Sequence, residues 1–142
     1  MSDAKTTGSC QCGAVTYELT GEPMFAAHCC CNSCKKASGA DHITAAFYSD
    51  DQIELKGDVS SYSAQADSGA TSTRHFCPTC GSRLFSTNSG RAGVKGFQVG
   101  TMDNPSGIQP RAVVYSKDKN AWDSFNEALP QFEKMPPPPP AR

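Results

Sequence analysis

Polar and apolar residues alternate in short runs along most of the chain. Val15, Tyr17 and Leu19 are separated by polar residues, a period of two that is typical of a β-strand with one buried face. Similar runs recur between clusters of Gly, Asp, Asn, Ser and Pro, which favour turns. The pattern predicts strands at residues 15–19, 24–28, 42–48, 53–56, 59–64, 71–76, 83–87, 94–99 and 111–116.

Helical periodicity is nearly absent. We expect helix only just after Cys34, over residues 35–38, and near residues 122–128. The length of 142 residues suits one domain, and the pattern predicts a mainly β domain. We place it at residues 8–133, between a flexible N-terminal tail at 1–7 and a flexible Pro-rich tail at 134–142.

The composition leaves little material for an ordinary hydrophobic core. Leu, Ile, Val and Phe together make up only 20 of the 142 residues, whereas the formal net charge is −1 and argues against a disordered chain. Metal sites stabilise such chains because metal binding is coupled to folding. The near-zero charge gives no reason to expect a nucleic acid or a membrane surface as partner.

The first residues lack the apolar segment of a secretory signal, and no apolar run approaches the ~18 residues of a membrane span. We therefore expect a cytoplasmic protein, in which thiols stay reduced. In that compartment the eight cysteines indicate metal or catalytic sites. Four disulfides in a secreted domain are the alternative.

The motifs Cys10-Gln11-Cys12 and Cys77-Pro78-Thr79-Cys80 are expected to form the two halves of one metal site. Residues i and i+2 of an extended segment project to one face, so the first motif places two sulfurs side by side. In the second motif, proline and the following glycine favour a turn that brings both sulfurs together. Four thiolates complete a closed, structural Zn²⁺ site.

The second cysteine group spans residues 29–34. Strand alternation puts Cys29 and Cys31 on one face and Cys30 on the other, and a turn returns Cys34 to the first face. Three thiolates leave the fourth position of a zinc ion for substrate, as catalytic zinc requires. A second structural zinc is the alternative, closed by Cys30 or by a histidine, either His28 or His42.

Several segments of the chain resemble one known family. They read GSCQCGAVTYE at residues 8–18, CCCNSCKKASG at 29–39, FCPTCGS at 76–82 and GTMD at 100–103, followed by Trp122 and an LPQF run at 129–132. In order and spacing they resemble the glutathione-dependent formaldehyde-activating enzymes, a family that includes centromere protein V. The resemblance extends from about residue 8 to residue 132.

The resemblance implies an Mss4-like fold of short antiparallel sheets with two zinc ions per chain. It implies a structural zinc on Cys10, Cys12, Cys77 and Cys80 and a catalytic zinc on Cys29, Cys31 and Cys34. The implied activity is that of a carbon–sulfur lyase, which forms or breaks S-hydroxymethylglutathione from glutathione and formaldehyde. Cys30 stands where the family usually has histidine.

The expected partner is therefore a small thiol similar to glutathione. His28 and His42 are candidates for a general base, and Lys35, Lys36 and Arg74 are candidates for binding substrate carboxylates. Two other functions fit the same cysteines. One is a non-catalytic binding module stabilised by zinc, and the other is a redox sensor that releases zinc on oxidation of its crowded thiols.

Overall fold

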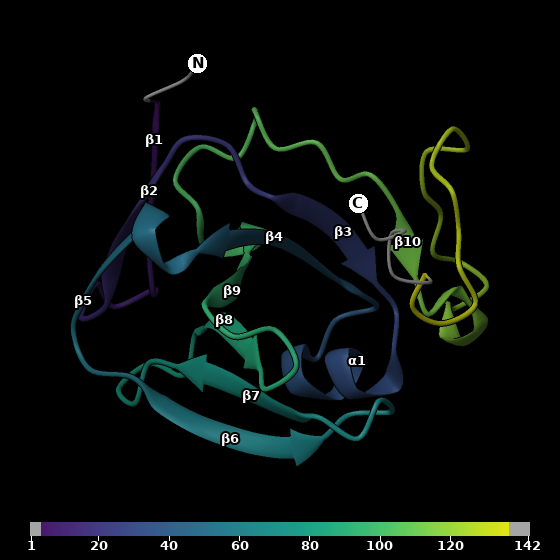
Figure 1. The fold of residues 1–142 in the computed structure, drawn as a ribbon, viewed down its shortest axis with the longest axis horizontal. Helices are drawn as coiled ribbons and strands as arrows, with labels where there is room; N and C mark the ends of the chain where they lie inside the picture. The colour runs from purple at the N-terminus through teal and green to yellow at the C-terminus, as the bar shows by residue number, and fades with distance from the viewer. Residues whose placement is uncertain (1–3, 137–142) are drawn as a thin grey trace.

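The chain forms two β-sheets that enclose a shared core, as seen in a computed structural model that describes residues 4–136 (Figure 1). The smaller sheet has the strand order β1-β2-β5, and the larger has the order β10-β3-β4-β9-β8-β7-β6. All neighbouring strands are antiparallel except β10 and β3. The prediction of a mainly β fold with antiparallel sheets is confirmed.

The strands follow the alternating runs of the sequence closely. Their bounds are β1 Lys5–Ser9, β2 Thr16–Thr20, β3 Phe25–Cys29, β4 Ile43–Ser49, β5 Ile53–Lys56, β6 Ser60–Gln65, β7 Thr71–Phe76, β8 Arg83–Asn88, β9 Val94–Gln98 and β10 Val113–Val114.

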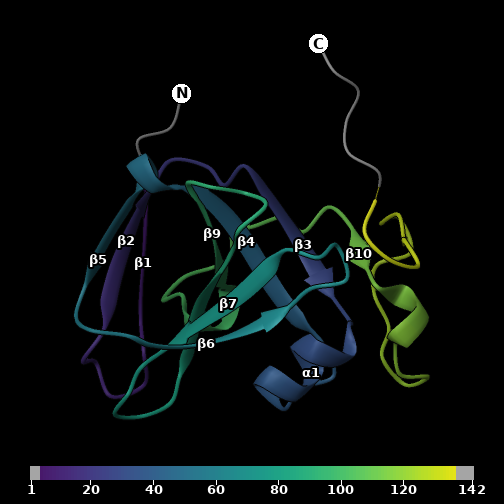
Figure 2. The same ribbon diagram turned by 60° about the horizontal axis from the view of Figure 1, so that its bottom comes forward.

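The one α-helix of the described residues is α1, at Asn32–Ser38, and it contains the predicted helical segment 35–38. It begins after Cys31, whose sulfur accepts a hydrogen bond from the backbone of Cys34, and ends at Gly39, which has a φ of 72°. Figure 2 shows α1 beneath the ends of β3 and β4. Three short 3₁₀ turns lie elsewhere, η1 at Asp50–Gln52, η2 at Val99–Thr101 and η3 at Ser116–Asp118.

The core is built around Phe97 of β9. Its ring lies 4.5 Å from that of Tyr17 in the smaller sheet and 5.2 Å from that of Phe85 in β8, centroid to centroid. Val15 and Leu19 are also fully buried, as the alternation over residues 15–19 predicts. The two sheets are therefore joined by a few large side chains, which suits a chain with so few aliphatic residues.

The first strand lies where the sequence predicted a flexible tail. β1 starts at Lys5 and pairs along its whole length with β2, so the tail prediction is wrong for residues 5–7. The strand was missed because it is polar and lacks apolar alternation. Its buried position is Gly8, where a side chain would collide with the Tyr17 ring of the neighbouring strand.

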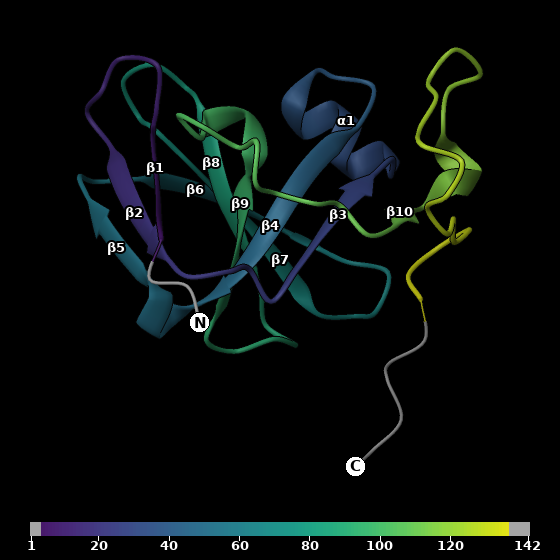
Figure 3. The ribbon, with the colours of Figure 1, turned by 90° about the horizontal axis from the view of Figure 1, so that it is seen from above.

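The segment after β10 lies outside β10, the edge strand of the larger sheet on the side away from the smaller sheet (Figure 3). The helix predicted near residues 122–128 is absent, and the segment consists of turns. Its side chains are held by other elements instead. Phe125 packs against the rings of His28 and His42, and Asp123 accepts a hydrogen bond from His42. Because these contacts hold the side chains, the backbone of the segment adopts turns instead of a helix.

Residues 1–3 and 137–142, which belong to the two predicted tails, lie outside the described residues. Within residues 4–136, no helix has both the length and the apolar character needed to cross a membrane.

The turn between β5 and β6 provides a test of how tightly it packs against the loop between β1 and β2. Gly57 has a φ of 100°, and a Cβ there would collide with the carbonyl oxygen of Ala14. Gly69 has a φ of 89° with open space around it. We expect Gly69→Ala to lower the free energy of unfolding by about 1 kcal/mol through backbone strain alone. Gly57→Ala should cost about 3 kcal/mol because the collision adds to the strain.

Denaturant titration of the two metal-loaded variants measures this difference. Equal losses in the two variants would mean that the loop around Ala14 moves freely, contrary to the packing described above.

Candidate metal centres

The four cysteines of the first predicted site converge on one point. Their sulfur atoms all lie within 4.8 Å of one another. The Cys10 and Cys12 sulfurs are 3.7 Å apart, and those of Cys12 and Cys77 are 3.8 Å apart. Sulfurs bound about 2.3 Å from one tetrahedral ion lie about 3.8 Å from each other. The spacing therefore fits a metal ion held by four thiolates.

Two loops from different sheets supply these sulfurs, the β1–β2 loop and the β7–β8 loop. Each loop turns through a glycine with positive φ, 83° at Gly13 and 81° at Gly81. The Gly81 amide donates to the carbonyl oxygen of Cys77 at 2.9 Å, which closes the second loop. The glycines thus allow each pair of sulfurs to point inward.

Backbone amides donate to the sulfurs of the four-cysteine group. The amides of Val15 and Thr79 lie 3.3 Å from the sulfurs of Cys10 and Cys77, respectively. The Ser82 hydroxyl lies 3.3 Å from the Cys80 sulfur, and hydrogen bonding to Ser82 lowers the pKa of Cys80 to about 5. Donors of this kind stabilise thiolates, which are the metal-binding form of cysteine.

The second predicted group is also brought together. The sulfurs of Cys29, Cys31 and Cys34 lie within 4.8 Å of one another, and those of Cys29 and Cys34 are 3.4 Å apart. Cys29 ends β3, Cys31 caps α1, and Cys34 lies in its first turn. The Cys34 amide donates to the Cys31 sulfur at 3.1 Å, so the helix start holds two of the three sulfurs in place.

Because the three thiols are crowded, their pKa values shift in opposite directions. Hydrogen bonds with Cys31 and Cys34, followed by burial, raise the pKa of Cys29. Hydrogen bonds with Cys29 and Cys34 lower the pKa of Cys31. One thiolate is thus stabilised at the expense of its neighbours, because three adjacent negative charges repel one another. A cation would remove this conflict, and we call these three residues the cysteine triad.

No fourth metal-binding side chain joins the triad among the described residues. Cys30 is fully buried and lies outside the group, as strand alternation predicts. His28 and His42 also lie outside it. The Nδ1 of His28 is 2.7 Å from the Thr44 hydroxyl, and the Nδ1 of His42 is 2.7 Å from the Asp123 carboxylate.

A narrow cleft adjoins the triad on the side of Cys34. The Nη2 of Arg74 lies 3.6 Å from the Cys34 sulfur. The cleft is lined by Cys34, Ala37, Ser38, Ile43, Arg74, Arg83, Phe85 and Gln98. The two histidines proposed as general bases are not among these lining residues.

Tyr115, just after β10, has an unusual backbone conformation with a φ of 56°. Its phenol donates to the Asp67 carboxylate at 3.1 Å. Burial and the hydrogen bond to Asp67 raise the pKa of Tyr115 to about 12, and charges on Cys31 and Cys29 contribute further. The side chain is therefore near the triad, and strained residues of this kind are common at functional sites.

The structure places the two lysines that were predicted to bind substrate outside the lining of the cleft. The Nζ of Lys35 donates to the carbonyl oxygen of Asp118 at 2.6 Å, which ties α1 to η3. Neither Lys35 nor Lys36 lines the cleft, whereas Arg83, Gln98 and Phe85 do. Sequence analysis did not single out these three residues, because nothing in their spacing relates them to the triad.

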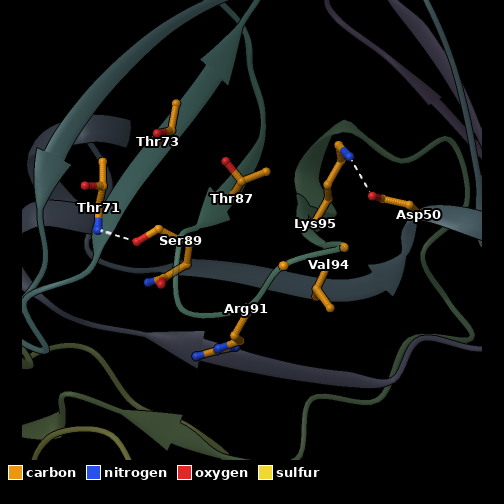
Figure 4. A pocket seen from close by; sticks show the side chains of 11 residues that line it. Asp50, Thr71, Thr73, Thr87, Ser89, Arg91, Val94 and Lys95 are labelled. Carbon is orange, nitrogen blue, oxygen red and sulfur yellow. Dashed lines mark hydrogen bonds and ion pairs between the residues drawn. The ribbon is translucent and has the colours of Figure 1, made fainter.

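A larger cavity of about 260 Å³ lies elsewhere, between the ends of β7, β8 and β9 (Figure 4). It is lined by hydroxyl groups such as those of Thr71, Thr73 and Thr87, and by the Lys95–Asp50 ion pair, with an Nζ–Oδ1 distance of 2.6 Å. It has no cysteine or histidine in its lining and is separate from both metal centres.

The chain is similar to known proteins in family model, in sequence and in structure. The model of the family described as glutathione-dependent formaldehyde-activating enzyme matches residues 5–118. A Halomonas elongata protein, assigned by name provisionally to the same enzymes, is 36% identical over 84 residues, which are 55% of this chain and 53% of that protein. The alignment thus spans about half the length of this curated relative.

A crystal structure of a Rhodobacter sphaeroides protein is also similar, with a TM-score of 0.54 and 25% sequence identity. The similarity covers 74% of this chain and 92% of that one.

The two neighbours Cys30 and Cys31 allow a matched test of the triad. We expect Cys31→Ala to lose about one metal ion per chain, since two remaining thiolates hold a divalent ion poorly. Cys30→Ala should keep the full metal content and lose only the packing of a small buried side chain. Elemental analysis of the purified variants measures both. Metal loss from Cys30→Ala equal to that from Cys31→Ala would contradict the assignment of the triad.

Proposed function

Because the chain belongs to the glutathione-dependent formaldehyde-activating enzyme family, we propose that it is a zinc-dependent carbon–sulfur lyase. Its substrate is the adduct of glutathione and formaldehyde, S-hydroxymethylglutathione, or a related thiol adduct, which it forms or breaks down. The proposal includes two zinc ions per chain and a location in a reducing compartment, the cytoplasm, where the eight cysteines stay free.

The observation that carries this proposal is the number of ligands in each cysteine group. Four sulfurs complete the tetrahedral coordination of zinc, whereas the three sulfurs of Cys29, Cys31 and Cys34 leave one position for a substrate atom. Closed zinc sites are structural, and open ones support chemistry. We therefore assign the first group to folding and the triad to the reaction.

The donor atoms fit zinc. Soft thiolate ligands select zinc, copper(I) and iron–sulfur clusters over hard ions such as magnesium and calcium. The sulfur–sulfur distances of 3.7 and 3.8 Å in the four-cysteine group match the spacing expected around one tetrahedral ion. Backbone amides directed at the sulfurs of Cys10, Cys77 and Cys31 favour the deprotonated state that zinc requires.

The proposed reaction joins the sulfur of the thiol to the carbon of formaldehyde. The thiol proton leaves to solvent, and the new hydroxyl oxygen takes up a proton, so that no net charge is formed. Bound zinc would supply a cation that stabilises the substrate thiolate or polarises the carbonyl oxygen. The triad fixes the place of reaction, and Arg74 donates to the Cys34 sulfur, where it offsets the charge of three thiolates.

The family's usual histidine is replaced by Cys30 in this chain. The Cys30 side chain is fully buried and points away from the three sulfurs, so the exchange leaves the triad complete. We therefore propose that the replacement affects packing beneath the site more than metal binding.

Metal content and turnover together test this function. We expect two zinc ions per chain, of which only the triad ion is removed by mild chelation and is protected when glutathione is present. The chain should accelerate formation of S-hydroxymethylglutathione, followed by NMR. Cys34→Ala should keep the four-cysteine zinc and reduce the rate to that of the uncatalysed reaction.

Two inert zinc ions and no acceleration would favour a zinc-stabilised binding module instead. Zinc release by peroxide from the triad alone, without turnover, would favour a redox sensor.

A further inference from the structure

Two arginines line the cleft beside the triad without an acidic partner. Arg74 is on β7 and Arg83 is on the neighbouring strand β8. Neither takes part in an ion pair within residues 4–136, and no aspartate or glutamate lines the cleft. The chain as a whole has 14 acidic and 13 basic residues. The cleft thus holds two half-buried guanidinium groups: that of Arg74 is partly offset by the Cys34 sulfur, whereas that of Arg83 has no acidic partner within residues 4–136.

The surroundings keep both guanidinium groups at the cleft. The central carbon of the Arg83 guanidinium lies 5.3 Å from the centre of the Phe76 ring, a cation–π contact. Arg74 donates from Nη2 to the Cys34 sulfur at 3.6 Å and retains other N–H groups for a second partner. Both arginines are therefore placed within one cleft that also contains a sulfur of the triad.

We infer that Arg74 and Arg83 bind a carboxylate of the thiol substrate and make the site selective for anionic thiols. This inference rests on the proposed function and adds a specificity-determining subsite to it. Guanidinium groups bind carboxylates through paired N–H···O hydrogen bonds, which are stronger than those between neutral groups. Arg74 would then link the cysteine triad to the anionic end of the substrate.

The shape of the cleft limits what enters it. The space open to the centre of a water molecule is only about 10 Å³, so the cleft holds about one water-sized group. The remaining walls are mostly small or apolar, including Ala37, Ile43 and Phe85. Such a cleft has room for one oxygen of a carboxylate, and the rest of the substrate would lie outside it.

Lys35 and Lys95 are less suited to this role. Lys35 is held by the Asp118 carbonyl, and Lys95 is paired with Asp50 at the larger cavity. Neither lines the cleft beside Cys34. Arg83 is therefore the residue to test, since it contacts the cleft and no sulfur of the triad accepts a hydrogen bond from it.

The test compares two thiols with two arginine variants of the zinc-loaded protein. Glutathione carries carboxylates, and glutathione diethyl ester keeps the thiol but not the negative charges. Calorimetry measures the binding of both to the wild type, to Arg83→Gln and to the control Arg111→Gln, whose side chain is exposed. We expect Arg83→Gln to bind glutathione about tenfold more weakly, as loss of a charge-assisted hydrogen bond implies.

Binding of the ester should be weaker than that of glutathione in the wild type and unchanged by Arg83→Gln. Arg111→Gln should behave as the wild type with both thiols. Arg83→Lys, which keeps the charge but loses the paired N–H groups, should fall between the wild type and Arg83→Gln. Zinc content and the thermal unfolding midpoint confirm that each variant is folded.

Equal affinity of the wild type for the two thiols, or an equal loss for both in Arg83→Gln, would overturn the inference even if the enzyme turns over. Carboxylate-dependent binding without turnover would retain the subsite and overturn the proposed lyase instead. If neither thiol binds, the subsite and the proposed lyase are both overturned.

Discussion

The crowding of thiol sulfurs is the constraint on which this structure depends. Seven of the eight cysteines lie in two groups whose sulfurs approach within 4.8 Å. Adjacent thiolates repel one another, so each group acquires its full negative charge only with a cation at its centre. The four-cysteine group joins the β1–β2 loop to the β7–β8 loop and so ties the smaller sheet to the larger. Metal binding thereby supplements a core with few large apolar side chains.

The triad is built from local structure. Cys29 is the last residue of β3, and Cys31 serves both as a triad sulfur and as the N-cap of α1. Because the Cys34 amide donates to the Cys31 sulfur, forming the helix also orders the group. The parallel pairing of β10 with β3 sets Val114 opposite Cys29 and brings Tyr115 to the triad. That tyrosine has a φ of 56°, a conformation that non-glycine residues rarely adopt.

Charge around the triad is arranged asymmetrically. Arg74 and Arg83 face the cleft on one side, while His28 and His42 lie in a separate cluster with Phe125. The histidines make hydrogen bonds to Thr44 and Asp123 and hold the segment after β10 in place. Their nearness to the cysteines in sequence therefore reflects a packing role, whereas the arginines come to the site from strands some 40 or more positions away in the sequence.

The sequence alone determined the features that depend on local geometry. Alternation fixed the buried face of β2 and the opposite directions of Cys30 and Cys31, and turn chemistry with cysteine spacing identified both groups. Prediction from the sequence failed for β1, which is polar and depends on pairing with β2. It also failed for residues 122–128, where side chains are held by His28 and His42. Only the tertiary structure brought Arg83 to the cleft beside Cys34, and Tyr115, with its partner Asp67, to the neighbourhood of the triad. Such contacts depend on how distant strands pair, and short-range patterns in a chain carry no record of that.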